Sequence, residues 1–202
     1  TALGVLMQDQ VYLRRFGLDS STVMCAVMPN TYEYYWNTSA EGAFTKLEKA
    51  RQDFWTEERK AKARNLGLSM NEVTVLPAIV EEETNKNDEK PLVSSVYLNR
   101  YRKGMRLQAD PTVKFALQDF GLKRIRENHT LFDSPYNTYR YPGLPPGPIC
   151  TPSSKTLDAV LNTPETDYLY FCARSDFSGY HAFASTYREH LQNAHKYQAA
   201  LN

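Results

Sequence analysis

The sequence predicts an α+β fold that is mostly helical, with a small β element near the C-terminus. Three observations support this class. Apolar residues recur at helical spacing in stretches rich in Ala, Glu, Lys and Arg, and capping signals precede several of these stretches. One pair of short apolar runs, within residues 168–184, has the pattern of a hairpin. The 202 residues are enough for one domain with a proper core, alone or with an appendage.

Composition excludes several classes of protein. Lys and Arg number 24 against 23 Asp and Glu, so the net charge of +1 gives no field for binding nucleic acid. Cys25, Cys150 and Cys172 show neither metal-ligand spacing nor an even disulfide set, and Cys172 is expected to be a buried thiol. No apolar run approaches the roughly 20 residues of a membrane span, and no signal peptide is visible. Because Thr1 is not an initiator Met, we expect a cut-out or processed chain from which a targeting segment could have been removed.

The first third of the chain has weaker signals. Residues 3–13 are predicted to form a short helix, and residues 22–27 a short buried strand. Residues 28–36 are dense in aromatics, which suits either a platform for stacking sugars or a packed boundary between lobes. Residues 39–65 contain no proline and are predicted to form one long amphipathic helix that Gly67 ends.

A capping signal opens the next helix. Ser69 and Glu72 have the spacing of a capping box, so we expect a helix that runs into Thr84. Pro77 lies inside this stretch, and it either kinks the helix or moves its start to about Thr74.

One of three consecutive glutamates in this helix falls among apolar residues. With Leu76 at 0° and 100° per residue, Ile79 lies at about 300° and Glu83 at about 340°. Glu81 and Glu82 point instead toward water, at about 140° and about 240°. A carboxyl group against an apolar wall keeps its proton, as a general acid must near neutral pH. The simpler interpretation is a solvated helix face, or an inward Glu paired with an Arg.

The elements that follow are marked by Pro and Gly. After a polar turn at residues 85–90, Pro91 is predicted to open a helix that stops at Gly104. Residues 105–110 form a connector, and Pro111 opens a third helix over residues 112–119. Two antiparallel helices with Glu83 at the end of the first would form one wall of a cleft.

The last part of the chain alternates loops with short elements. Residues 121–132 are predicted to form a basic loop or short helix, and residues 134–139 and 143–148 ordered, rigid loops. The remaining predictions are a helix over 153–161, strands over 168–173 and 180–184, and a terminal helix over 187–201 capped by Thr186 and Glu189.

Several motifs, in this order, resemble those of the endolytic murein transglycosylases of the MltG (YceG-like) family: AIVEEET, VYLNRYRKGMRLQADPTV, SPYNTY, GLPPGPI, and YLYF followed by His181-Ala-Phe183. The resemblance runs from about Met28 to the C-terminus and is densest over residues 83–149, while residues 1–27 add little. On this basis residues 1–37 are predicted to be an N-terminal remnant or boundary segment and residues 38–202 the catalytic domain. Pro77 and Cys150 depart from the family pattern.

The resemblance implies a lysozyme-like core that cleaves peptidoglycan glycan strands. Glu83 corresponds to the second Glu of the family's E-x-E-T motif, which makes it the catalytic acid and then base. The expected product carries 1,6-anhydroMurNAc, and neither a metal nor a cofactor is expected. Proteins that polymerise glycan are expected as partners, and only the resemblance suggests them.

The resemblance also bears on location. Members of the family carry an N-terminal membrane span and a LysM-like module, and both are expected to be absent or nearly so from this chain. We therefore expect the full protein on the periplasmic face of the inner membrane, held there only by the absent anchor, and this chain itself to be soluble.

The family pattern places further polar residues around the cleft. Gln108, Asp110, Asn137 and Tyr139 suit sugar hydroxyls and N-acetyl groups, and Thr84 follows the acid directly. Either Tyr136 or Tyr139 could stack on a sugar ring. Asp110 has the simpler interpretation of a helix N-cap ahead of Pro111.

Two other polar residues have structural interpretations. Arg100 and Glu89 are expected to form a structural ion pair. His181 could be a base, but a single His between strand residues is more often structural.

Two other functions fit the sequence. A hydrolytic muramidase would use Glu83 as acid and Asp110 as the carboxylate that activates water. A non-catalytic glycan-binding or scaffold module would explain the aromatic loops, but it gives no reason for a carboxylate on an apolar stripe.

Overall fold

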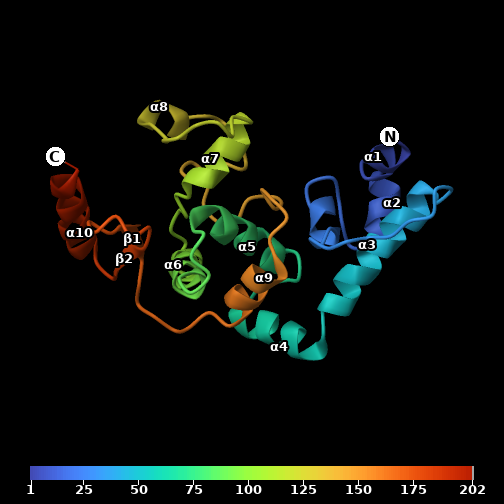
Figure 1. Cartoon of the computed structure of the whole chain (residues 1–202), viewed down its shortest axis with the longest axis horizontal. Coiled ribbons are helices and arrows are strands. Elements are labelled where there is room, and N and C mark those ends of the chain that lie inside the picture. The colour runs from blue at the N-terminus through green and yellow to red at the C-terminus, as the bar shows by residue number, and fades with distance from the viewer. Residues whose placement is uncertain (202) are drawn as a thin grey trace.

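Helix α5 (Glu72–Glu83) runs through the middle of the molecule, and the other elements are arranged around it (Figure 1). The computed structural model describes residues 1–201. Besides α5 it contains helices α1 (Ala2–Leu6), α2 (Gln10–Arg14), α3 (Ala40–Phe54), α4 (Glu57–Leu66), α6 (Lys90–Arg102), α7 (Asp110–Leu117), α8 (Glu127–Thr130), α9 (Ser154–Leu161) and α10 (Tyr187–Ala200), the 3₁₀ helix η1 (Val23–Ala26), and strands β1 (Tyr170–Ala173) and β2 (His181–Ala184). The predicted mostly helical α+β class is confirmed, and its lysozyme-like character stays a prediction.

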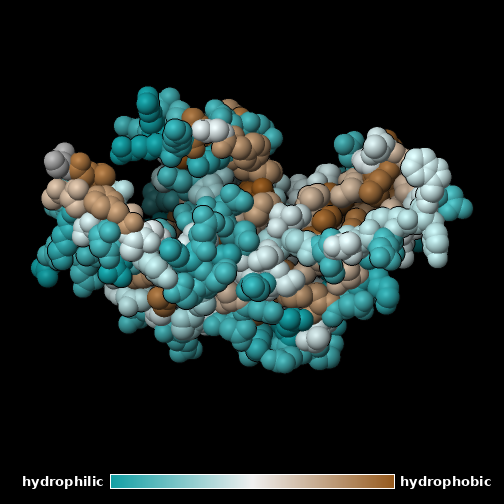
Figure 2. Space-filling model, viewed as in Figure 1, coloured by the Kyte–Doolittle hydropathy of each residue, from teal (hydrophilic) through white to brown (hydrophobic). Residues whose placement is uncertain are grey.

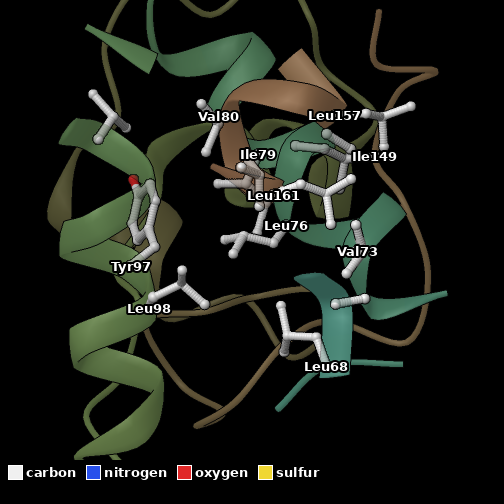
Figure 3. Close-up of a cluster of buried hydrophobic side chains, with 14 of the residues drawn as sticks. Leu68, Val73, Leu76, Ile79, Val80, Tyr97, Leu98, Ile149, Leu157 and Leu161 are labelled. Atoms are coloured by element: carbon white, nitrogen blue, oxygen red, sulfur yellow. The ribbon is translucent and has the colours of Figure 1, made fainter. Parts of the chain in front are cut away.

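The main core is built on α5 because eight consecutive residues of this helix, 73–80, are buried. Helices α6, α7 and α9 all pack against it. Figure 3 shows Leu76 and Ile79 of α5 among side chains of α6 and α9, such as Leu98 and Leu157. Full burial of each such side chain contributes about 1.5–3 kcal/mol. This packing fixes where the C-terminal end of α5, and hence Glu83, is held.

The two hydrogen bonds of the predicted capping box between Ser69 and Glu72 are present, although the N-cap residue of α5 is Asn71. The backbone N–H of Ser69 donates to the Glu72 carboxylate at 2.8 Å, and the Glu72 N–H donates to Ser69 Oγ at 3.2 Å. Pro77 lies inside the helix, which starts at Glu72 and not near Thr74. Burial of the apolar residues on both sides of Pro77 holds the helix together despite the lost backbone donor.

A second, smaller core lies at the N-terminus. Its buried residues lie in α2, in η1 and between them, together with Phe44 of α3: Tyr12, Leu13, Leu18, Val23, Cys25 and Ala26. Residues 1–26 are thus folded onto α3, at one side of Figure 1. The predicted domain boundary after residue 37 stays a prediction.

Two predictions for the N-terminal segment are wrong. The helix predicted over residues 3–13 is divided in two, because Asp9 accepts hydrogen bonds from Val11 N and Tyr12 N and so caps a new helix, α2. The strand predicted over residues 22–27 is the 3₁₀ helix η1. Its turn is started by Asp19, whose Oδ1 accepts from the backbone N–H of Thr22 at 2.8 Å.

The long helix predicted over residues 39–65 is two helices, α3 and α4. Thr56 separates them, because its backbone is extended and its hydroxyl oxygen accepts from the backbone N–H of Arg59 at 3.3 Å, which makes it the N-cap of α4. Trp55 at the break is buried. Gly67, with a φ of 76°, ends α4 as predicted.

Most elements after α5 follow the prediction. Pro91 lies in the first turn of α6, and Gly104 with a φ of 67° follows its end. Strands β1 and β2 pair antiparallel with Phe171 opposite Phe183, and a capping box of Thr186 and Glu189 starts α10. The predicted basic segment contains the short helix α8.

The surface is mixed in character. Hydrophilic side chains cover α4 and α8, while apolar side chains reach the surface over the N-terminal helices (Figure 2). Of the helices within residues 1–201, none is both long enough and apolar enough to cross a membrane.

Removal of one core side chain tests the central role of α5. Ile79 is fully buried, and Ile79→Ala is expected to lower the free energy of unfolding by about 2–5 kcal/mol, because it leaves a cavity. The control is Val11→Ala, at a side chain that is 78% exposed, and it should change stability by less than about 0.5 kcal/mol. Urea unfolding curves measure both. A loss at Ile79 no larger than that at Val11 would contradict the packing.

Candidate active site

The Glu83 carboxyl group lies in a cavity of about 210 Å³ at the C-terminal end of α5. The wall is built from several elements: α5, α6, the connector after α6, α7, a loop and β1. The lining residues are Glu83, Tyr97, Arg100, Leu107, Gln108, Asp110, Tyr139 and Phe171. Two carboxyl groups, a guanidinium group and two phenols therefore converge on one small space.

The helix places Glu83 at the edge of the core. It is the last residue of α5, and Thr84, with extended backbone, ends the helix. The buried run stops at Val80, so Glu83 remains partly accessible from the cavity. This agrees with the predicted position on the apolar side of the helix.

The prediction that Glu81 points to water is wrong. Lys90 Nζ, itself buried, donates to Glu81 Oε2 at 3.0 Å, and the Thr156 hydroxyl donates to the same oxygen. Helices α6 and α9 pack over the helix face that the periodicity assigned to solvent. Of the three glutamates only Glu82 is exposed.

The hydroxyl of Tyr97 donates a hydrogen bond of 2.6 Å to Glu83 Oε1. Burial raises the pKa of the Glu83 carboxyl from its ordinary 4.5 to about 7, and the negative charge of Asp110 acts in the same direction. The hydrogen bond from Tyr97 and the positive charges of Lys114 and Arg100 lower this pKa. The balance leaves a carboxyl group that can give or take a proton near neutral pH.

Arg100 fixes the wall of the cavity. Its Nε donates to the Leu169 carbonyl at 2.6 Å, and Nη1 donates to the Leu107 carbonyl at 2.7 Å. Burial lowers the pKa of this guanidinium. Arg100 thus joins α6 to the segment before β1 and to the connector that carries Gln108.

The predicted pair of Arg100 and Glu89 does not form. The Glu89 carboxylate instead accepts from the His181 backbone N–H at 2.7 Å and lies 2.9 Å from His181 Nδ1. His181 therefore ties β2 to the start of α6, and it is outside the lining of the Glu83 cavity.

Asp110 is the second carboxyl group of the cavity. The Tyr139 hydroxyl donates to Asp110 Oδ1 at 2.6 Å, and burial raises the pKa of Tyr139. The N-cap of α7 is Ala109, and Asp110 is the first helical residue. The simpler interpretation of Asp110 as an N-cap is therefore wrong.

Gln108 lines the cavity with an uncommon backbone. Its φ of 54° lies in the left-handed region, which non-glycine residues rarely adopt. The backbone N–H of Gln108 donates to the Thr138 carbonyl at 3.1 Å, and its side-chain oxygen lies 3.4 Å from Arg100 Nη1. Such a conformation is held by its surroundings and is frequent at functional sites.

The structure does not bring Asn137 and Thr84 into the cavity lining. Asn137 is fully buried, and its Nδ2 donates to the carbonyls of Thr130 and Phe132 at 2.9 and 2.7 Å. It holds the loop that carries Tyr139. The hydroxyl oxygen of Thr84 accepts from the Lys86 N–H at 3.0 Å and closes the turn after α5.

Sequence reasoning missed three lining residues and gave Arg100 another role; the three are Tyr97, Leu107 and Phe171. A signal existed for α6, because Val93, Tyr97 and Arg100 are spaced to share one helix face. An aromatic hydroxyl and a guanidinium group on an otherwise apolar face indicate a polar partner in the core.

Larger recesses of about 620 and 640 Å³ lie elsewhere on the protein. Neither has Glu83 or Asp110 in its wall. A carboxyl group with a raised pKa, a second carboxyl group and a fixed cation occur together only in the smaller cavity among the recesses described, which makes it the candidate active site.

Comparisons with known proteins agree with the motifs. The sequence profile of the YceG-like family matches residues 6–196, so the match begins well before Met28, where the resemblance was expected to start. An endolytic murein transglycosylase of Bacillus subtilis is 33% identical over 177 residues, which cover 87% of this chain and 48% of that protein. One from Streptococcus pneumoniae is 29% identical over 151 residues, covering 73% of this chain and 27% of that protein.

A solved structure has a similar fold. The crystal structure of a YceG-like protein from Listeria monocytogenes, 29% identical, aligns with a TM-score of 0.78 over 94% of this chain and 66% of that one. This chain spans about half the length of the Bacillus relative and less of the Streptococcus one.

The raised pKa of Glu83 predicts a pH-dependent cost to stability. A raised pKa means that the folded state resists ionisation, so stability is fully present below pH 4.5 and is lost as pH rises through about 7. Glu83→Gln removes this loss. The stability of the variant relative to the wild type should therefore grow by up to roughly 3 kcal/mol between about pH 4 and about pH 8.

Thermal and urea unfolding at both pH values measure this difference. The control is Glu33→Gln, at an exposed side chain, which should change stability equally at both pH values. A Glu83→Gln difference that is the same at both pH values would show that the carboxyl group ionises freely.

Tyr97→Phe tests the hydrogen bond to Glu83. Because the hydroxyl favours the carboxylate form, its removal should raise the pKa of Glu83 above about 7, by roughly one unit. Carbon-13 NMR titration of the Glu carboxyl carbons, with Glu83→Gln to assign the signal, measures the shift. An unchanged or lower pKa in the variant would contradict the contact.

Proposed function

The chain belongs to the YceG-like family, and from this membership and the geometry around Glu83 we propose that it is the catalytic part of a lytic murein transglycosylase. The proposed substrate is the glycan strand of peptidoglycan, and the proposed bond is the β-1,4 bond between MurNAc and GlcNAc. The observation that carries the proposal is a carboxyl group with a pKa of about 7, hydrogen-bonded to a buried tyrosine in a small polar cavity.

The proposed reaction has two proton transfers at Glu83. The protonated carboxyl group gives its proton to the glycosidic oxygen, and the bond from that oxygen to MurNAc C1 breaks. The resulting carboxylate takes the proton of the MurNAc C6 hydroxyl, whose oxygen bonds to C1 and closes the 1,6-anhydro ring. No water is consumed, and Glu83 ends protonated. A pKa near 7 suits both steps, since neither form of the group is strongly favoured.

The other groups of the cavity have supporting roles in this proposal. Asp110 adds negative charge beside the developing positive charge at C1, which stabilises it. Gln108 and Tyr139 offer an amide and a hydroxyl for sugar hydroxyls or the N-acetyl group. Tyr97 and Arg100 hold Glu83 and the walls in place. Thr84 and Asn137 have an indirect role: they hold the backbone of the turn after α5 and of the loop that carries Tyr139.

A hydrolytic muramidase is the second candidate, because Asp110 lies in the same cavity as Glu83. In that reaction Asp110 would activate a water molecule, while Glu83 would act only as the acid. A glycan-binding module without activity would have no use for the raised pKa of Glu83. A peptidoglycan substrate would place the protein outside the cytoplasm, with glycan-polymerising proteins as partners.

Cleavage of purified glycan strands by the full-length protein tests the proposal. We expect products that end in 1,6-anhydroMurNAc, one water lighter than hydrolysis products, with no label taken up from oxygen-18 water. Glu83→Gln should lower the rate at least about 100-fold, and Glu33→Gln should retain it. Mass spectrometry and product release measure these outcomes.

Two results would count against the proposal. Products that carry oxygen-18 at a reducing end would favour the muramidase, and a second variant, Asp110→Asn, should then remove cleavage. Turnover by Glu83→Gln at the wild-type rate would remove Glu83 from the chemistry.

A further inference from the structure

A second recess of about 230 Å³ lies beside the Glu83 cavity. The two share helices: Glu82 in the second recess directly precedes Glu83 on α5, and Lys114 lies one turn after Asp110 on α7, about 6 Å along the axis. The charge of Lys114 also lowers the pKa of Glu83. A group bound in this recess would therefore lie next to the reacting bond.

The recess contains one cation and one anion that are not paired with each other. Within residues 1–201, the Lys114 ammonium makes no ion pair or hydrogen bond, and Glu82 has no cation within ion-pair distance. The Cys150 thiol lies beside Glu82, and burial together with this carboxylate raises the thiol's pKa to about 12, so it stays a protonated neighbour. Neither charge is neutralised by an ion pair within residues 1–201, so each can meet an opposite charge on a ligand.

The rest of the recess is apolar. Pro111 and Ile149 are buried in its wall, and Phe115 packs on Tyr136 with 4.7 Å between ring centroids. Phe120 completes the wall, although its side chain is 65% exposed. Hydrophobic side chains reach the surface over α7 in Figure 2. The recess thus suits a ligand with small apolar groups and with both signs of charge.

We propose that this recess holds the peptide that branches from the glycan strand, with Lys114 on a peptide carboxylate and Glu82 on a peptide ammonium group. The proposal rests on the proposed function. A strand's sugar hydroxyls carry no formal charge, whereas its peptides carry carboxylates, an ammonium group and alanine methyls. The peptide is attached to MurNAc, the ring whose C1 reacts beside Glu83, and in this proposal it leaves the cavity toward this recess.

Binding to the cleavage-deficient full-length protein tests the proposal without depending on the reaction. With Glu83→Gln as background, a GlcNAc–MurNAc oligosaccharide that bears the peptide should bind about tenfold more tightly than the bare sugar, in which a neutral methylamide of the lactyl carboxyl group replaces the peptide. Adding Lys114→Met should remove most of this difference and leave the Kd for the bare sugar within about twofold. The matched control is Lys123→Met, at an exposed lysine outside both recesses, which should leave both values unchanged.

Kinetics with active protein give a second measurement. At about pH 5.5, where Glu83 stays protonated with or without the Lys114 charge, Lys114→Met should raise KM about tenfold on peptide-bearing strands. Strands stripped of peptide by an amidase, with each lactyl carboxylate then converted to a neutral methylamide, should show no change in KM. Glu82→Gln should act in the same direction with a smaller effect.

The outcomes separate the two proposals. If Lys114→Met weakens the binding of the bare sugar and of the peptide-bearing sugar equally, the recess holds the sugar chain. If it weakens the binding of neither, the recess holds neither the sugar chain nor the peptide. Both results would overturn the peptide site. Failure of the wild-type protein to cut either strand would overturn the proposed function, while the binding comparison would still decide the peptide site.

Discussion

The hydrogen bond from Tyr97 to Glu83 is the contact on which the candidate site depends. Burial alone would drive the Glu83 carboxyl group strongly toward its protonated form, and the tyrosine hydroxyl opposes this by stabilising the carboxylate. The two effects leave a pKa of about 7. The hydrogen bond forms only at one spacing between α5 and α6, and the main core sets that spacing. The packing of the core therefore also determines the pKa of Glu83.

Polar groups buried around the site are paired with backbone or with each other. Arg100 donates to carbonyls on two segments, Asn137 holds the loop that carries Tyr139, and Lys90 joins α6 to Glu81 on α5. Each such group would be costly to bury without a partner. Together they tie the segments around the cavity to one another, and the proposed electrostatic catalysis would require walls held in place in this way.

Sequence alone determined the elements whose signals are local. The Ser69 and Glu72 capping box, Pro91 in the first turn of α6 and the hairpin at residues 170–184 follow from neighbours within a few positions. The side of α5 on which Glu83 lies followed from helical periodicity, which needs no knowledge of the partner helix. At Thr56 two local signals competed: the helical spacing of apolar residues favoured one continuous helix, and the N-capping residue favoured a break. The N-cap prevailed, and the helix is broken there.

Only the tertiary structure decided which side chains meet Glu83. Tyr97 contacts Glu83 and Arg100 lines the same cavity because α6 packs against α5. Glu81 is covered because α6 and α9 pack on the face that periodicity left to water. Asn137 belongs to the SPYNTY motif, yet its side chain donates to backbone carbonyls of its own loop and does not line the cavity. Periodicity gives the direction of a side chain about its own helix axis, whereas contacts and pKa values depend on the distance between segments far apart in the chain, and that distance is set by how the whole core packs.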